Sequence, residues 1–403
     1  MKLGIDVLLN DSELLSQLKN RRLALLANPA SMTGHFIHSV DAIKQVSELN
    51  LCAAFGPQHG MRGEKQDNMI ESDDYIDPVY QIPVFSLYGK IRRPSSRMMD
   101  TFDILLFDVQ DLGTRIYTFL TTLLYVLEAA AQSGKSIWVL DRPNPVGRPV
   151  EGSLLDIKKW TSFVGAAEFP MRHGLTLGEA AKWFVKNKNL QVDLKIVPMQ
   201  DYNPTIKPGF GWPLGEISWV NPSPNAATLN MARCYPGTVL LEGTELSEGR
   251  GTTRPLEMIG APDIQGNTLL QKMENLAPNW MQGCKLRSCY FQPTFHKHIG
   301  KICSGFQIHT DDKAYQHEIF KPYRLIALAL KGIRALHPGY PIWRDFHYEY
   351  EKERLAIDLI NGGSTLREWV DNPNATPNDL EKILAHDERS WVETRKPFLN
   401  YPG

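Results

Sequence analysis

The sequence has few cysteines, no long hydrophobic run and no excess of charge of either sign. Its five cysteines are odd in number and scattered, which favours reduced thiols in the cytoplasm over a disulfide framework. No apolar run approaches the roughly 20 residues of a membrane-spanning helix. The first residues show no apolar segment and no small-residue cleavage site, so we expect no signal peptide.

The charges nearly cancel: 44 lysines and arginines face 45 aspartates and glutamates, a formal net charge of −1. A general nucleic-acid or membrane-surface partner would need a basic field. We therefore expect neither partner. With 403 residues, of which 42% are hydrophobic, the chain can bury a full core in two domains or one large one.

Common cofactor and metal motifs are also missing. No GxGxxG follows the first predicted strand, and neither GxxxxGK[ST], HExxH, GxSxG nor an EF-hand pattern occurs. We therefore expect no cofactor and no metal. A metal site formed by His59, Asp67 and His173 remains an alternative that no spacing supports.

Short apolar runs alternate with helical patterns in the first half of the chain, and this alternation predicts a parallel sheet covered on both faces. The predicted strands are 22–27, 51–55, 84–87, 102–109, 136–140, 192–197 and 302–309. The predicted helices are 39–49, 117–132, 178–188, 323–336, 355–361 and 379–392.

A stretch dense in proline, glycine and tryptophan, residues 204–224, separates this region from the rest of the chain. We predict an α/β protein with an N-terminal parallel-sheet domain, 1–228, and a smaller α+β domain, 229–403, that completes a cleft. Every predicted strand of the first domain ends in a polar loop rich in glycine or proline. The carboxyl ends of parallel strands share one edge, so these loops should converge.

Polar side chains suited to a binding site follow the predicted strands. The loop 55–68 carries Gln58, His59, Arg62 and Glu64 among three glycines. A glycine-rich loop at a strand end is a common position for ligand-binding groups. The alternative interpretation of this loop is a capped turn whose charged side chains are solvated.

The segment 108–117 offers a carboxylate inside an apolar strand, Asp108, which is costly to bury unless paired. Asp111 and Arg115 are four residues apart, which predicts a pair at a helix start. The alternative is an N-cap with a surface ion pair. In 141–147, two prolines would present Arg142 and Asn144 rigidly, although the same residues also fit a stiff turn.

Two further segments contain candidate groups. Glu151 and His173 lie next to glycines, and a lone histidine is more often structural than catalytic. Residues 241–252 combine three carboxylates and Arg250 with three glycines, which makes a helix unfavourable. Carboxylates, arginines, asparagines, tyrosines and tryptophans at loop ends suit glycosidic chemistry, in which one carboxyl donates a proton and another stabilises or activates.

Taken together, the motifs resemble those of the exo-acting β-N-acetylmuramidase family, long catalogued as a conserved domain of unknown function. They occur in the order FGPQHGMRGE, PVFSLYG, LLFDVQDLGTRIYTF, VLDRPNPVG, VEG, MRHGLTLGE, PSPN, YPGTVLLEGTELSEGRGT and IGAP. The resemblance extends from about residue 22 to the C-terminus.

This resemblance implies a Rossmann-like N-terminal domain, a smaller second domain, and a cleft between them. It also implies release of N-acetylmuramic acid from the non-reducing end of peptidoglycan fragments, in cell-wall turnover or recycling. The candidate catalytic residues are Glu64, Glu248, Asp108 and Asp111. The candidate substrate-binding residues are Asn28, Gln58, His59, Arg62, Arg115, Tyr117, Arg142, Asn144, Glu151, His173, Asn225 and Arg250.

The chain departs from the family pattern at Gln58, where many members carry a glutamate. An amide cannot donate a proton, so Glu64 would take over, or the acetamido group of the substrate would attack with a single acid present. The alternatives are a muropeptide-binding protein without activity and a metal-dependent hydrolase that uses His59 and His173.

If Glu64 or Glu248 is the general acid, its replacement by glutamine should lower kcat by on the order of 10² or more. Turnover of a chromogenic β-N-acetylmuraminide measures this change. An unchanged kcat in either variant removes that residue from the role.

Overall fold

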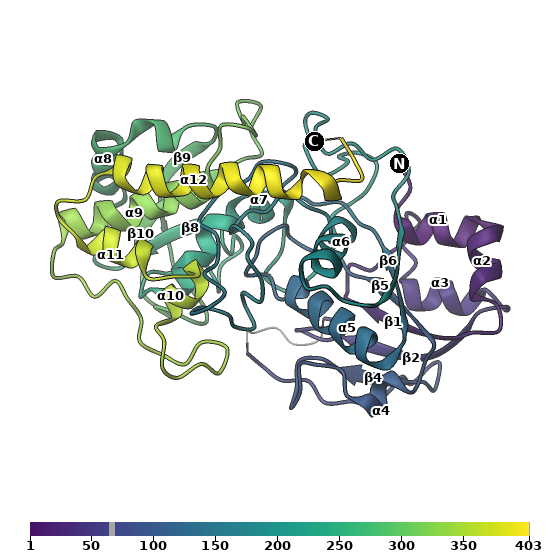
Figure 1. The fold of residues 1–403 in the computed structure, drawn as a ribbon. Helices are drawn as coiled ribbons and strands as arrows, with labels where there is room; N and C mark the ends of the chain where they lie inside the picture. Colours follow the sequence, from purple (N-terminus) through teal and green to yellow (C-terminus); the bar gives the residue numbers. More distant parts are fainter. Residues whose placement is uncertain (64–68, 403) are drawn as a thin grey trace.

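The computed structural model describes residues 1–63 and 69–402. Its strands form two sheets (Figure 1). The seven-stranded sheet contains β1 (Arg22–Ala27), β2 (Asn50–Gly56), β3 (Tyr75–Ile76), β4 (Pro83–Ser86), β5 (Ile104–Asp108), β6 (Ser136–Leu140) and β7 (Asp193–Val197). The three-stranded sheet contains β8 (Met258–Ala261), β9 (Lys285–Phe291) and β10 (Cys303–His309).

The larger sheet has the strand order β3-β4-β2-β1-β5-β6-β7. All neighbouring pairs are parallel except β3 with β4 at the edge. Without β3, this is the order of a doubly wound Rossmann sheet, in which the strand order reverses between β1 and β5. The predicted α/β, Rossmann-like class is confirmed, and the antiparallel edge strand is a feature that the sequence pattern did not predict.

Alternate residues of each central strand enter two different cores. In β1, Leu23 and Leu25 pack with α1 (Gly4–Asn10) and α3 (Ser39–Gln45), whereas Leu26 packs on the opposite face. Because both faces of the sheet are buried, the strands read as continuous apolar runs.

Helices cover both faces of this sheet (Figure 1). On one side lie α1, α2 (Ser12–Leu18) and α3, and on the other lie α4 (Ser96–Met99), α5 (Phe119–Ser133) and α6 (Leu177–Asn187). α5 ends at Gly134, which adopts a left-handed conformation as its cap. This second core continues without interruption into the C-terminal half.

The C-terminal half packs helices around its antiparallel sheet, which has the order β8-β10-β9. Its helices are α7 (Leu229–Thr238), α8 (Gly266–Leu276), α9 (Pro322–Leu336), α10 (Ala356–Asn361), α11 (Thr365–Asp371) and α12 (Pro377–Arg395). Short 3-10 helices span Val239–Gly243, Pro278–Met281 and Lys396–Phe398. The predicted smaller α+β part is confirmed.

Helix α12 crosses from the C-terminal half to the N-terminal half, so that the two chain ends lie near each other in Figure 1. Beyond it, Tyr401 packs in the core that contains α1 and donates a hydrogen bond from its hydroxyl to Asp141 Oδ2 at 2.8 Å. The last residues therefore belong physically to the first sheet.

Two buried charged side chains connect the halves by forming hydrogen bonds with the free backbone groups at helix ends. Arg115 donates to the carbonyl oxygens of Ile360 and Asn361, at 3.0 and 2.6 Å, at the C-terminal end of α10. Glu151 accepts from the backbone N–H groups of Tyr323 and Arg324, at 3.1 and 2.9 Å, in the first turn of α9. A cation at a C-terminus and an anion at an N-terminus both complement the helix dipole.

The predicted helix start at Asp111 and Arg115 is wrong. α5 begins at Phe119, and residues 109–118 form an irregular segment. Asp111 accepts from Gly113 N–H at 2.6 Å, while Arg115 also donates to the carbonyl oxygens of Ser153 and Phe169. The backbone carbonyl groups of distant segments, rather than a neighbouring carboxylate, hold this guanidinium.

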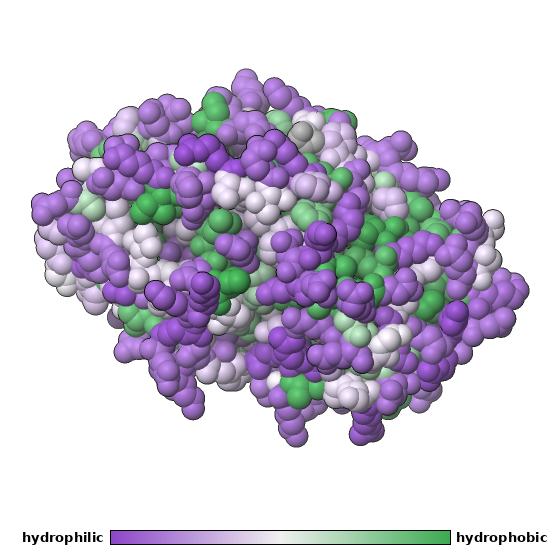
Figure 2. Space-filling view, in the orientation of Figure 1, coloured by the Kyte–Doolittle hydropathy of each residue, from purple (hydrophilic) through white to green (hydrophobic). Residues whose placement is uncertain are grey.

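Among the described residues, no helix is long and apolar enough to cross a membrane. Figure 2 shows polar and charged residues over most of the viewed face, interrupted by smaller apolar areas. All five cysteines are free thiols.

Replacing Arg115 by lysine should lower the free energy of unfolding by about 3 kcal/mol, because an ammonium cannot satisfy four carbonyl oxygens that the guanidinium reaches. Thermal or urea unfolding measures the change. Arg22→Lys is the control, since this half-exposed arginine pairs with Asp103 at the surface and should change stability by less than about 1 kcal/mol. Equal stability of the two variants would contradict the structural role.

Candidate functional site

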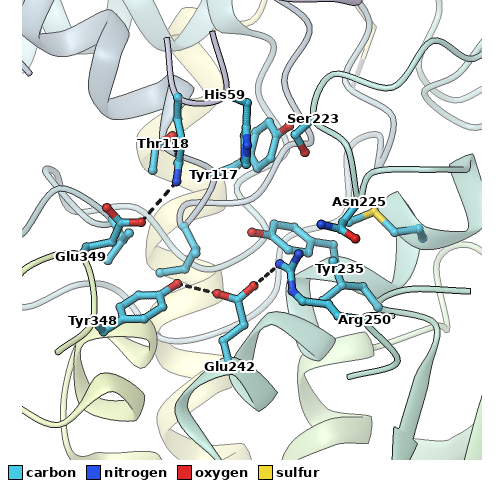
Figure 3. Close-up of a pocket in the computed structure, with 15 residues that line it drawn as sticks. His59, Tyr117, Thr118, Ser223, Asn225, Tyr235, Glu242, Arg250, Tyr348 and Glu349 are labelled. Carbon is cyan, nitrogen blue, oxygen red and sulfur yellow. Dashed lines mark hydrogen bonds and ion pairs between the residues drawn. The ribbon is translucent and has the colours of Figure 1, made fainter. Parts of the chain in front are cut away.

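A polar cavity lies between the two halves of the chain (Figure 3). The N-terminal half contributes the loop after β2, the segment before α5 and the loops that contain Val164 and residues 223–225. The C-terminal half contributes α7, the 3-10 helix Val239–Gly243 and two loops. The lining residues are Gln58, His59, Ile116, Tyr117, Thr118, Val164, Ser223, Asn225, Met231, Tyr235, Glu242, Arg250, Leu256, Tyr348 and Glu349.

On the N-terminal side, Gln58 and His59 follow the carboxyl end of β2. His59 has a φ of 74°, and Gly60 continues the left-handed turn with a φ of 83°. This turn brings the chain back after β2 and sets both side chains at the cavity. The Gln58 Oε1 atom accepts a hydrogen bond from the Thr118 hydroxyl at 2.8 Å, which links the β2 and β5 loops.

On the C-terminal side, Glu242 is held at both carboxylate oxygens. Arg250 Nη2 donates to Oε1 at 2.6 Å, and the Tyr348 hydroxyl donates to Oε2 at 2.7 Å (Figure 3). In the described part of the chain, Arg250 Nη1 is buried without a hydrogen-bond partner. The arginine therefore keeps one donor group for a ligand.

Behind Arg250, Glu248 lies in a cluster of positive charge. Its carboxylate is 2.6 Å from Lys297 Nζ, 3.2 Å from Arg250 Nε and 3.5 Å from His296 Nδ1. Burial alone would raise the pKa of Glu248, but these three charges outweigh it and hold the pKa at about 2. An acid of that strength is ionised at neutral pH, and Glu248 does not line the cavity, so the structure argues against its predicted role as general acid.

Glu349 is the cavity carboxyl that has no cationic partner within ion-pair distance in the described residues. Its Oε2 accepts from the Tyr88 hydroxyl at 2.7 Å and its Oε1 from Gln58 Nε2 at 3.3 Å. Burial raises the pKa of Glu349, while hydrogen bonds from Tyr88 and Gln58 and the charge of Arg92 oppose the rise. A raised pKa is what a carboxylic acid needs to donate a proton near neutral pH.

Five of the predicted site residues meet at this cavity: Gln58, His59, Tyr117, Asn225 and Arg250. Tyr117 packs edge-on against Tyr235, with ring centroids 5.9 Å apart. Gln58 and Arg250, the first and last of the five, are 192 positions apart in the sequence, and the fold brings them together at the cavity.

Three other predicted residues form a buried polar network at the crevice between β1 and β5. Arg142 donates to Asp108 from Nε at 2.5 Å and from Nη2 at 2.9 Å. Asn28 Nδ2 donates to the Gln110 carbonyl oxygen at 3.0 Å. Asp108 is thus paired as the cost of its burial requires, and the position where Rossmann sheets bind dinucleotides is occupied by these side chains.

The remaining predicted residues also lie outside the cavity lining. Asn144 donates to the Gly147 and Leu175 carbonyl oxygens and shapes its own turn. Arg62 is half-exposed, 3.6 Å from Asp77. Arg115 and Glu151 close helix ends, as described above.

His173 and Asp111 are buried next to each other, with His173 Nε2 3.9 Å from Asp111 Oδ2. Burial lowers the pKa of His173 to about 3 and raises the pKa of Asp111 to about 7. The histidine is therefore neutral, and its Nδ1 accepts from the Leu175 N–H.

Glu64 and Asp67 lie outside the described residues, and the role predicted for Glu64 stays a prediction. Among the residues that are described, no three histidine, cysteine, aspartate or glutamate side chains are grouped as a metal site would require.

The sequence patterns missed several lining residues, listed here by position: Thr118, Ser223, Tyr235, Glu242, Tyr348 and Glu349. Glu242 belongs to the glycine-rich stretch 241–252 that was recognised as a candidate. Glu349 lies in a charged segment without glycine or a preceding strand, which reads as solvated surface. The alternation of tyrosine with Glu349 is the one signal that could have indicated it.

Two carboxyl groups in different surroundings, one ion-paired and one held by neutral donors, together with an arginine and several tyrosines, are typical of a glycoside hydrolase site. The comparisons identify the family. The family model described as exo-beta-N-acetylmuramidase NamZ, N-terminal, matches residues 23–230, and its C-terminal counterpart matches residues 233–401. The chain belongs to this exo-β-N-acetylmuramidase family, which confirms the resemblance seen in the motifs.

A relative from Bacillus subtilis (strain 168), the peptidoglycan beta-N-acetylmuramidase NamZ, is 37% identical over 402 residues, which are 99% of this chain and 91% of the relative. Two solved structures of DUF1343 family proteins from Bacteroides fragilis NCTC 9343 are also similar. One has a TM-score of 0.85 and 26% identity and covers 100% of this chain and 99% of its own. The other has a TM-score of 0.77 and 27% identity, with coverage of 99% and 98%.

The raised pKa of Asp111 predicts a pH-dependent stability. The folded chain holds this proton more tightly than the unfolded chain, so its contribution to stability is present near pH 4 and is lost as the pH rises through about 7. Asp111→Asn keeps an acceptor for Gly113 and removes the ionisation. Its thermal unfolding midpoint should exceed that of the unaltered chain at pH 8, and the difference should shrink by pH 5.

The exposed Asp73 provides the control, because Asp73→Asn should leave the unfolding midpoint unchanged at both pH values. A large loss of kcat in Asp111→Asn, without the stability change, would instead support the catalytic role predicted from the sequence.

Proposed function

We propose that this chain is an exo-β-N-acetylmuramidase that hydrolyses the bond to a terminal N-acetylmuramic acid residue at the non-reducing end of peptidoglycan fragments. The observation that supports it most directly is the cavity between the halves, which combines two carboxyl groups, Arg250 and tyrosine rings in a member of this family.

We propose that Arg250 binds the lactyl carboxylate, the group that distinguishes N-acetylmuramic acid from N-acetylglucosamine. Its Nη1 is buried at the cavity and bonded to no other described group, while Glu242 and Glu248 fix the rest of the guanidinium. Arginine binds carboxylates through parallel N–H groups, which gives both affinity and orientation.

The other polar groups of the cavity suit a sugar ring. His59, Asn225, Ser223 and Thr118 carry donors and acceptors of the kind that bind hydroxyl and acetamido groups, and Tyr235 offers a ring face. The proposed division of the chain at residues 228 and 229 is supported by the separate matches to 23–230 and 233–401.

We further propose that the enzyme works in the cytoplasm, in turnover or recycling of the cell wall. Five free thiols support a reducing compartment.

The chain should release 4-nitrophenol from 4-nitrophenyl β-N-acetylmuraminide. The matched β-N-acetylglucosaminide lacks the lactyl carboxylate, and its kcat/KM should be lower by on the order of 10² or more, because it leaves the buried Arg250 Nη1 group without an acceptor. Arg250→Lys should raise KM for the muraminide by about tenfold, since lysine retains the charge but loses the planar fork.

Three results would contradict parts of this proposal. Binding of N-acetylmuramic acid without turnover of any muraminide would indicate a binding protein. Loss of turnover on treatment with a chelator, restored by a divalent metal, would indicate the metal-dependent alternative. Equal kcat/KM for the two glycosides would remove Arg250 from recognition of the carboxylate.

A further inference from the structure

We propose that Glu349 is the proton donor in glycosidic cleavage and that Gln58 and Tyr88 are the positioning residues that hold its carboxyl group. This inference rests on the proposed function and adds to it the identity of the acid. It concerns a residue that the sequence motifs did not indicate.

The position of Glu349 carries the proposal. It belongs to a loop of the C-terminal half, yet its carboxyl group is held by the N-terminal half, through Tyr88 after β4 and Gln58 after β2. Figure 3 shows Glu349 facing the cavity opposite Asn225 and Arg250. A proton donor placed across the cavity from Arg250, which would bind the lactyl carboxylate, can reach the glycosidic oxygen of a sugar bound between them.

Gln58 is itself oriented. Because its Oε1 accepts from the Thr118 hydroxyl, its Nε2 faces Glu349. An amide in this position cannot supply a proton, but it fixes the carboxyl group that can. The Gln58 departure from the family pattern then leaves a single proton-donating carboxyl at this point, where a glutamate would give a pair sharing a proton.

The backbone around Glu349 is also held in an uncommon conformation. Glu349 and Tyr350 have φ values of 49° and 67°, in the left-handed region that non-glycine residues seldom adopt. Met69 contributes to holding them, since its sulfur lies 3.2 Å from the Glu349 nitrogen and its carbonyl oxygen accepts from the Tyr350 hydroxyl at 3.0 Å. Such strain persists where surrounding contacts over-determine a functional geometry.

The charges that face Glu349 come from several elements. Arg92 is stacked between the rings of Tyr88 and Tyr350 and attracts the carboxylate, whereas the nearby Glu242 repels it. His59 lines the same cavity. Burial prevails over the attractions, so the pKa of Glu349 is raised, in contrast to Glu248 with its pKa of about 2.

In the proposed step, the proton of the Glu349 carboxyl group moves to the glycosidic oxygen while the bond from that oxygen to C1 of the muramic acid residue breaks. The leaving sugar departs as an alcohol and Glu349 becomes a carboxylate. A water molecule supplies the new hydroxyl group at C1, and its other proton returns to Glu349. The sum is the addition of one water across the glycosidic bond.

The decisive experiment compares two substrates with Glu349→Gln. On the disaccharide of N-acetylmuramic acid β-linked to N-acetylglucosamine, kcat should fall by on the order of 10² or more. On the 4-nitrophenyl glycoside the loss should be at least tenfold smaller, because nitrophenolate departs without a proton. Glu353→Gln, an exposed carboxyl on the same loop, is the matched control and should keep full activity on both substrates.

A pH profile provides the second readout. Gln58→Glu places another carboxyl group where the amide nitrogen now lies, 3.3 Å from Glu349 Oε1. Repulsion between the two carboxylates should raise the pKa of the pair and move the basic limb of kcat/KM to higher pH. A role in folding alone would leave this limb where it is.

The outcomes separate this inference from the proposed function. If the unaltered chain cleaves the muraminides and Glu349→Gln keeps full disaccharide activity, the assignment of Glu349 is overturned and the function stands. The assignment is also overturned if Glu349→Gln loses activity on both substrates equally while calorimetry shows unaltered binding of N-acetylmuramic acid. It is likewise overturned if only Glu64→Gln loses much more activity on the disaccharide than on the nitrophenyl glycoside. An unaltered chain that cleaves neither substrate would overturn the function and this inference together.

Discussion

The arrangement of the two halves depends on buried charges that close helix ends across their interface. Arg115, from the segment after β5, satisfies carbonyl oxygens at the end of α10, and Glu151 satisfies N–H groups at the start of α9. Neither charge could stay buried without these partners. Because the same segment continues through Tyr117 and Thr118 into the cavity, the contact that joins the halves also fixes one wall of the site. Binding geometry and stability are therefore coupled through a few residues.

The first half of the fold could be predicted because its strands are buried on both faces. β1 and β6 were predicted with their observed bounds, since Arg22–Ala27 and Ser136–Leu140 are apolar runs between polar turns. The helix predicted over 39–49 ends earlier, at Gln45, and the short α1, α2 and β3 were not predicted because a few residues carry too little periodicity. The strand order follows from long-range pairing, which no local pattern contains.

The site was predicted in part, and the errors have one physical cause. A polar residue at a strand end can face a ligand or can satisfy buried backbone groups, and sequence alone does not separate these roles. Gln58 and Arg250 face the cavity, whereas Arg142 neutralises Asp108. Glu349 was missed because its surroundings are set by Tyr88 and Gln58, which are more than 250 positions away in the chain.

The most direct test of this account is a crystal structure of the protein with N-acetylmuramic acid bound. The sugar should lie in the cavity between the halves, with its lactyl carboxylate at Arg250 Nη1 and its anomeric oxygen within hydrogen-bond distance of Glu349. A sugar bound at the crevice between β1 and β5, or one whose anomeric oxygen points away from Glu349, would contradict it.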